Sequence, residues 1–167
     1  MESSIRYERA LEYAREKHKN QYRIGGAAYI THPVGVADIV RQQGYSEDYQ
    51  IAALFHDLLE DTEAAEEEIL CYGNKEILEA VKAVTKPKGY VMETYIEGIC
   101  ANKMARVIKA ADRLHNLQSA KLTDNEFKRK YVVETINWYL DFHEDISKAL
   151  DELIESMEES WKKRMRF

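Results

Sequence analysis

Apolar residues recur every three or four positions along most of this chain. Tyr7, Ala10, Leu11 and Ala14 show this spacing near the amino terminus, and similar sets follow in the later segments. The period matches one face of an amphipathic α-helix. Only 7 Gly and 2 Pro occur among 167 residues, too few for the frequent turns of a β-sandwich or barrel. The sequence therefore predicts an all-α protein.

Capping and turn residues divide the chain into predicted helices. Their expected ranges are about 4–18, 31–43, 46–59, 62–72, 74–84, 92–99, 103–119, 125–142 and 145–163. Thr31 or His32 is expected to cap the second helix, Ser46 the third, Thr62 the fourth and Asn74 the fifth. We find no internal repeat, low-complexity linker or domain boundary, so the sequence predicts one domain over residues 1–167.

Composition limits the classes of partner. The formal net charge is −6 and no Lys/Arg-rich block occurs, which argues against nucleic acid and leaves a small molecule as the expected partner. Cys71 and Cys100 are too few for a cysteine metal site and fit a reducing compartment. No signal-peptide core or apolar stretch of about 20 residues is present. We therefore expect a cytoplasmic protein without a membrane segment, while its oligomeric state stays open.

Ionisable residues follow directly after the apolar run that ends at Phe55. His56 and Glu60 are four positions apart, as are Asp57 and Asp61, so on one continuous helix all four would share a broad face. Burying several carboxylates without a cation is costly. Imidazole nitrogen and carboxylate oxygen are ligands that suit Mn²⁺, Fe²⁺ or Zn²⁺. The segment therefore predicts a metal site.

Two residues elsewhere are candidates for further ligands. His32 lies at a predicted helix start, and Asp112 follows a largely apolar helical turn. Alone, Asp112 could equally be a salt-bridge partner of Arg106 or Arg113. A histidine, a His-Asp pair and a distant helical aspartate occurring together favour a metal centre.

Three longer motifs and one arginine carry a resemblance to a known family. The motifs are Tyr-Ile-Thr-His-Pro-Val-Gly-Val-Ala at 29–37, His-Asp-Leu-Leu-Glu-Asp-Thr at 56–62 and Lys-Ala-Ala-Asp-Arg-Leu-His-Asn-Leu at 109–117, and Arg23 lies nine residues before His32. Together they resemble the hydrolase domain of the RelA/SpoT alarmone enzymes, a group of HD-domain metal phosphohydrolases. The resemblance runs from about residue 13 to 139. Without a synthetase region, the chain looks like a small stand-alone alarmone hydrolase.

The resemblance implies a single HD-domain helical bundle with a central metal site. One ion, usually Mn²⁺ in the family, would have these ligands: His32, His56, Asp57 and Asp112. Glu60 and Asp61 would be the catalytic pair. The implied reaction removes pyrophosphate from the 3′ position of ppGpp or pppGpp, with the metal activating a water and offsetting phosphoryl charge.

The resemblance also implies a set of nucleotide-binding residues, namely Arg23, Lys109, Asn116, Ser119 and Tyr139. Three of the five have a simpler interpretation. Arg23 and Lys109 are of types that commonly lie at the surface, and Tyr139 could be part of the core.

The chain departs from the family pattern where the nucleotide would bind. Ile24 replaces a basic residue, the Ser-Gly-Glu-Pro that usually follows is absent, and Gln118 replaces an arginine. A second hypothesis is therefore the same chemistry on another nucleotide, such as a 5′-monophosphate or a 3′-phosphorylated dinucleotide cofactor. A third is a non-catalytic nucleotide-binding module, whose expected sign would be loss of the ligands or of Glu60 and Asp61.

Overall fold

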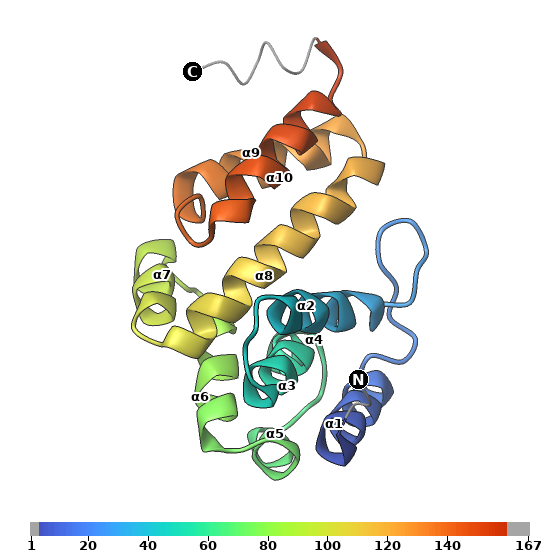
Figure 1. Cartoon of the computed structure of the whole chain (residues 1–167), viewed down its shortest axis with the longest axis vertical. Coiled ribbons are helices and arrows are strands. Elements are labelled where there is room, and N and C mark those ends of the chain that lie inside the picture. The colour runs from blue at the N-terminus through green and yellow to red at the C-terminus, as the bar shows by residue number, and fades with distance from the viewer. Residues whose placement is uncertain (1–3, 160–167) are drawn as a thin grey trace. The chain divides into compact units, whose positions relative to one another are not determined.

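The computed structural model describes residues 4–159, which form helices joined by short connections (Figure 1). The helices are α1 Ile5–Lys17, α2 Thr31–Gln42, α3 Glu47–Phe55, α4 Leu58–Asp61, α5 Glu66–Tyr72, α6 Lys75–Val84, α7 Met92–Cys100, α8 Lys103–Ser119, the 3₁₀ turn η1 Ala120–Leu122, α9 Asn125–Trp138 and α10 Glu144–Glu155. The extended pairing within the described residues is an isolated bridge between Tyr22 and Ala28. The predicted all-α class is confirmed.

The chain divides into two compact units, the first ending at Ala111 and the second beginning at Asp112. The first holds α1 to α7 and the start of α8, and the second holds the rest of α8 with η1, α9 and α10. A single domain over the whole length remains a prediction.

Helix α3 is the centre of the first unit. Its residues 51–55 are all fully buried, and α1, α2 and α6 pack against it. A helical segment that is apolar on every side, as residues 51–55 are, is stable only when other elements surround it. His56, which follows α3 directly, is thereby carried to the end of a rigid core element.

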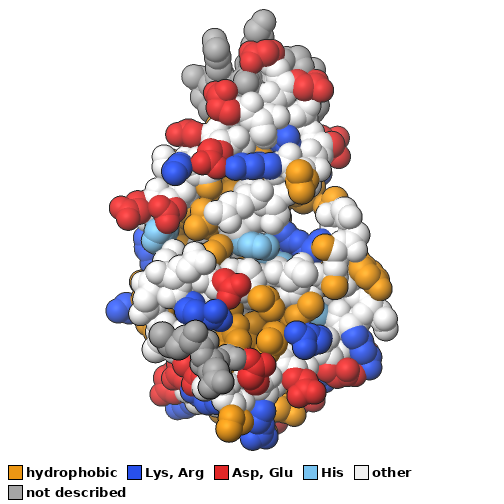
Figure 2. All heavy atoms as spheres, turned by 45° about the vertical axis from the view of Figure 1, so that its right-hand side comes forward, with side chains coloured by type: hydrophobic (Ala, Val, Ile, Leu, Met, Phe, Trp, Pro, Cys, Tyr) orange, Lys and Arg blue, Asp and Glu red, His pale blue; other side chains and the backbone are white. Residues whose placement is uncertain are grey.

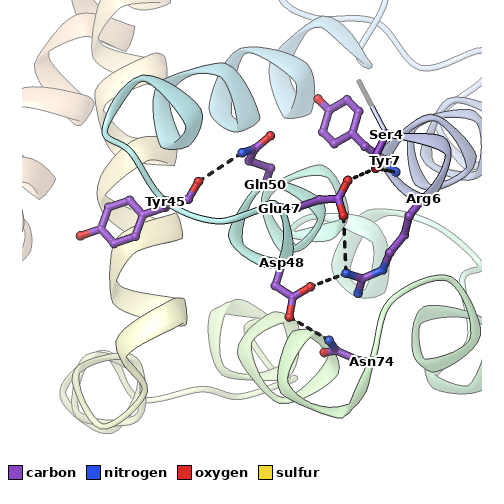
Figure 3. A network of polar contacts seen from close by, with 8 residues as sticks. All are labelled: Ser4, Arg6, Tyr7, Tyr45, Glu47, Asp48, Gln50 and Asn74. Atoms are coloured by element: carbon purple, nitrogen blue, oxygen red, sulfur yellow. Dashed lines mark hydrogen bonds and ion pairs between the residues drawn. The ribbon is translucent and has the colours of Figure 1, made fainter. Parts of the chain in front are cut away.

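A polar network joins the amino-terminal ends of α1, α3 and α6 (Figure 3). Ser4 caps α1 and contacts Glu47, while Arg6 pairs with Glu47 and Asp48. Asp48 also accepts a 3.0 Å hydrogen bond from Asn74, and Asn74 caps α6 as the sequence predicted. The network fixes α1 and α6 against the helix that leads to His56.

The predicted helix 46–59 is wrong in one respect, because α3 ends at Phe55 and α4 is a separate turn. His56 Nδ1 and the His56 backbone N–H both approach the carbonyl oxygen of Ala53, at 2.7 and 3.4 Å. A continuing helix would need that oxygen for the N–H of Asp57. The chain therefore turns at His56 and Asp57, and the four ionisable side chains do not share one continuous helix.

Thr62 ends α4 instead of capping α5. Its hydroxyl donates to the carbonyl oxygen of Leu58 at 2.7 Å, a bond within the preceding turn. Helix α5 begins later, and the Glu68 carboxylate accepts a 3.0 Å hydrogen bond from the backbone N–H of Ala65, the residue at its N-cap position.

The predicted cap of α2 is also wrong. Ile30 occupies the N-cap position, and its apolar side chain makes no hydrogen bond. Thr31 is already the first residue of α2, and its hydroxyl donates to the carbonyl oxygen of Ala28 at 2.7 Å. Ser46 does stand at the N-cap position of α3, again without a side-chain bond to the helix.

Towards the carboxyl terminus, α8 has the predicted bounds, and α9 ends four residues earlier than predicted, at Trp138. Helix α10 ends at Glu155, whereas the predicted range reached 163; positions 160–163 lie outside the described residues. In the second unit, Cζ of the buried Arg113 guanidinium lies 4.4 Å from the centroid of the Tyr139 ring. Arg113 Nη2 also pairs with Glu134 Oε1 at 2.9 Å.

Two predictions concern the surface of the protein: that it has no membrane segment and that it does not bind nucleic acid. Over residues 4–159, none of the helices is long and apolar enough to cross a membrane. On the face drawn in Figure 2, the described residues include both cationic and anionic side chains, and the two kinds are interspersed.

Candidate metal centre

His32, His56 and Asp57 form a compact cluster in the first unit. Ligand atoms of the three side chains lie within 4.8 Å of one another. His32 is the second residue of α2, and the other two occupy the turn between α3 and α4. Both imidazoles are almost completely buried and Asp57 is half-buried. The structure thus brings together three of the four predicted ligands.

Hydrogen bonding orients the His56 ring. A carbonyl oxygen only accepts, so the 2.7 Å contact between His56 Nδ1 and Ala53 places the proton on Nδ1. In the neutral ring, Nε2 then presents its lone pair, and it lies 3.0 Å from Asp57 Oδ2. His32 Nε2 lies 3.6 Å from the same oxygen.

The chemistry of this donor set fits a divalent metal ion. A proton on one imidazole would satisfy one of the two contacts with Asp57, whereas a divalent cation satisfies both at once. Two nitrogen donors and a carboxylate oxygen are also a ligand mix common for first-row metals. His32, His56 and Asp57 would hold the ion.

Tyr29 is a member of this site to which the sequence analysis assigned no role. Its hydroxyl donates to Asp57 Oδ2 at 2.6 Å. Its ring centroid lies 4.8 Å from that of His18 and 5.9 Å from that of His32. Tyr29 directly follows the loop and precedes His32 by three residues, a proximity to a predicted ligand that could have identified it.

His18 and Gln21 support the same loop. Gln21 Nε2 donates to the backbone carbonyl of Asp61 at 2.8 Å, and Gln21 Oε1 lies 2.8 Å from His18 Nδ1. Burial lowers the pKa of His18, which favours the neutral ring.

The predicted catalytic residues Glu60 and Asp61 lie on α4, immediately after the cluster, and both are exposed. Glu60 Oε1 accepts a 2.7 Å hydrogen bond from the backbone N–H of Lys86. Partial burial of the Asp61 carboxyl and the nearby Asp57 and Glu60 charges raise the pKa of Asp61 to about 6, although part of the side chain reaches solvent. Asp61 can therefore exchange a proton near neutral pH.

Asp112, the remaining predicted ligand, is the first residue of the second unit and lies in α8. It is buried, and its Oδ1 accepts a 3.0 Å hydrogen bond from Asn116 Nδ2 one turn later. This bond places the two side chains on one face of α8. Their roles as metal ligand and nucleotide contact remain predictions.

Arg23 and Lys109, the predicted nucleotide-binding cations, belong to the first unit. Arg23 lies in the turn closed by the bridge between Tyr22 and Ala28, and its N–H donates to Ala27 at 2.7 Å. Lys109 is half-buried, with Nζ 5.9 Å from the Tyr95 ring centroid.

Ser119 and Tyr139, the other predicted nucleotide contacts, lie in the second unit. The Ser119 hydroxyl donates to the carbonyl of His115 at 2.9 Å. Tyr139 is fully buried, with its ring against Arg113 and Phe142. Stacking of a base on Tyr139 stays a prediction that requires this ring to be uncovered.

Known proteins resemble this chain over the segments that carry the cluster of His32, His56 and Asp57. The HD domain family matches residues 10–94. A probable GTP pyrophosphokinase of Mycobacterium leprae is 38% identical over 142 residues, which cover 77% of this chain and 18% of that protein. A guanosine-3′,5′-bis(diphosphate) 3′-pyrophosphohydrolase of Aquifex aeolicus is 37% identical over 140 residues, covering 79% of this chain and 20% of that protein. The chain thus spans about a fifth of the length of these relatives.

A solved structure extends the likeness to nearly a whole chain. It is that of a metazoan ortholog of SpoT, described as hydrolysing ppGpp and playing a role in starvation responses. The TM-score is 0.76 at 25% identity, over 93% of this chain and 97% of the other. The family match contains His32, His56 and Asp57 together, and this chain belongs to the HD domain family.

Proposed function

We propose that this chain is a metal-dependent phosphohydrolase that removes pyrophosphate from the 3′ position of ppGpp or pppGpp. Water attacks the 3′-linked phosphorus, the bond to the 3′ oxygen breaks, and GDP or GTP is released with pyrophosphate. The observation that carries the proposal is the buried cluster of His32, His56 and Asp57 followed at once by the exposed pair Glu60 and Asp61.

The named activities of similar proteins support this substrate. The Aquifex aeolicus relative is named for hydrolysis at the 3′ position of guanosine bis(diphosphate). The metazoan protein, described as hydrolysing ppGpp, is matched over 97% of its chain. A solved chain of nearly this extent thus comes from a protein described as hydrolysing ppGpp.

The metal is proposed to be one Mn²⁺ ion, with Asp112 as a fourth ligand beside His32, His56 and Asp57. When bound, such an ion acidifies a water and offsets charge on the phosphoryl oxygens. Asp112 is suited to the role because it is a buried carboxylate whose Oδ1 is held by Asn116.

Glu60 and Asp61 are proposed to manage the protons of the reaction. One proton leaves the attacking water and one reaches the departing 3′ oxygen. The Lys86 N–H fixes Glu60 at the exposed edge of the site, and Asp61 follows it directly at an exposed position of α4.

The nucleotide is proposed to contact Arg23, Lys109, Asn116, Ser119 and Tyr139. Ile24 is 70% exposed beside Arg23, at a position where the RelA/SpoT hydrolase domains have a basic residue. This observation favours a second candidate function, the same hydrolysis acting on a 5′-monophosphate or a 3′-phosphorylated dinucleotide cofactor.

A nucleotide panel tests these alternatives. The full chain is incubated with Mn²⁺ and ppGpp, pppGpp, nucleoside 5′-monophosphates or a 3′-phosphorylated dinucleotide cofactor, and pyrophosphate and phosphate release are measured. We expect one pyrophosphate per ppGpp consumed and no release by Asp57→Ala. Hydrolysis of another nucleotide with ppGpp left intact would establish the second candidate. No turnover and no Mn²⁺ binding would favour the non-catalytic module.

A single domain over residues 1–167 and a cytoplasmic location complete the proposal. Mild proteolysis that yields one resistant core of nearly full length would support the single domain. Cleavage that releases a stable fragment ending near Ala111 would contradict it.

A further inference from the structure

The loop between α1 and α2 contacts the cluster of His32, His56 and Asp57 through Tyr29, and two further side chains of the loop, His18 and Gln21, support Tyr29 and α4. Tyr29 donates its hydroxyl proton to Asp57 Oδ2 at 2.6 Å. This distance lies within the range of about 2.5–2.7 Å that is typical of an O–H to carboxylate bond, which is stronger than a bond between neutral groups. The bond fixes the oxygen of Asp57 that lies nearest to both imidazoles.

The hydrogen bonds of Gln21 determine which ring nitrogen of His18 carries the proton. The carbonyl oxygen of Asp61 only accepts, so the amide nitrogen of Gln21 must face it and Gln21 Oε1 must face His18. Nδ1 of His18 then carries the proton. Nε2 is buried and makes no hydrogen bond within the described residues. The contact of the His18 ring with Tyr29 is therefore one of packing.

The packing of His18 restricts the Tyr29 ring. The two ring centroids are 4.8 Å apart, and the His18 side chain is only 2% exposed. Gln21 anchors His18 to the backbone of Asp61, at the far end of α4. The turn that carries Asp57 and α4 is therefore held at both ends by one loop.

We propose that Tyr29, braced by His18 and Gln21, is a positioning residue that orients the Asp57 carboxylate for metal binding. The inference rests on the proposed function in taking Asp57 as a ligand. Hydrogen bonds that orient metal ligands commonly contribute about 10–100-fold to metal affinity. Tyr29 is expected to contribute on this scale.

Tyr29→Phe tests the hydroxyl alone, because the ring and its contacts with His18 and His32 are kept. Mn²⁺ binding to the full chain is measured by isothermal titration calorimetry near neutral pH. We expect the Kd to rise at least about tenfold, with the melting temperature of the metal-free protein close to that of the wild type.

Tyr22→Phe is the matched control, since it removes a tyrosine hydroxyl from the same loop at a side chain that is 67% exposed. Its Mn²⁺ affinity should equal that of the wild type. The double variant His18→Leu with Tyr29→Phe tests the bracing. If His18 acts through the Tyr29 hydroxyl, the double variant should bind Mn²⁺ as Tyr29→Phe does.

Asp57→Ala separates failure of this inference from failure of the proposed function. Normal Mn²⁺ affinity in Tyr29→Phe, with binding lost in Asp57→Ala, would overturn the role of Tyr29 and leave the metal site intact. Normal affinity in Asp57→Ala, or no binding by the wild type, would instead contradict the proposed metal site. A loss in the double variant greater than that in Tyr29→Phe would show that His18 does not act through the Tyr29 hydroxyl.

Discussion

The side chain of Asp57 contacts both imidazoles of the candidate metal site and the loop between α1 and α2. Its Oδ2 accepts the Tyr29 bond and lies beside both imidazoles, whereas Glu60 lies on the exposed edge of α4. We therefore expect Asp57→Ala to abolish Mn²⁺ binding, and Glu60→Gln to retain it while losing about 100-fold or more in kcat. Calorimetry with Mn²⁺ and steady-state kinetics with ppGpp measure the two effects. Full activity of Glu60→Gln would show that the catalytic assignment is wrong.

The titration of Asp61 can be measured without metal. Partial burial, then the Asp57 and Glu60 charges, raise its pKa to about 6. Replacing Asp57 by Asn removes a negative charge that disfavours the Asp61 carboxylate, so the pKa of Asp61 should fall, but only part of the way because its burial remains. Carboxyl carbon NMR of metal-free wild type and Asp57→Asn measures both midpoints. A wild-type midpoint near 4, or no decrease in the variant, would contradict this electrostatic account.

At the residue level, the sequence predicted that His32, His56 and Asp57 belong to one site, because their residue types and the motifs around them resemble those of the HD-domain metal phosphohydrolases, and the structure brings the three side chains together. It did not reveal Tyr29 as a partner of Asp57. The bond between them joins residues 28 positions apart, and such a contact depends on how α2 packs against α3. The buried Tyr139 likewise could not be distinguished from an accessible aromatic residue by sequence alone.

Among the elements, the bounds of α8 and the cap of α6 were predicted because caps and apolar spacing are local signals. The break between α3 and α4 was not. Residues 51–61 have good helical spacing, and the break depends on the His56 ring using the Ala53 carbonyl. A side chain that takes a backbone acceptor leaves little trace in periodicity.

Replacing either of two glycines by alanine should change the free energy of unfolding, but in opposite directions. A Cβ on Gly73, after α5, would lie 2.9 Å from the Ile69 carbonyl oxygen and 3.0 Å from Ile77 Cγ2, whereas one on Gly98, within α7, would meet nothing within 4 Å. Gly73→Ala should therefore lower the free energy of unfolding by about 1–3 kcal/mol. Gly98→Ala should raise it by about 0.5–1 kcal/mol, because alanine restricts the unfolded chain and favours helix. Urea unfolding of both variants measures the changes; the same sign in both would refute the steric argument.

For the whole molecule, metal binding should appear as stability. Mn²⁺ held by residues that the fold assembles binds the unfolded chain weakly, so at about 100 times its Kd it should add about 2.7 kcal/mol. For a chain of this size that corresponds to a rise of roughly 5–10 °C in the melting temperature. Differential scanning fluorimetry with Mn²⁺, reversed by a chelator, measures the shift.

Asp112→Asn makes the same measurement a test of the fourth ligand. The substitution keeps the side-chain shape and removes the charge, so the metal-free protein should melt near the wild-type temperature while most of the Mn²⁺ shift is lost. Asp151→Asn, at an exposed position of α10, is the matched control and should retain the full shift. A full shift in Asp112→Asn would mean that another group completes the metal site. Loss of the shift only in Asp112→Asn would instead show that the carboxylate charge of this single residue of α8 supports the bound metal, as a ligand must.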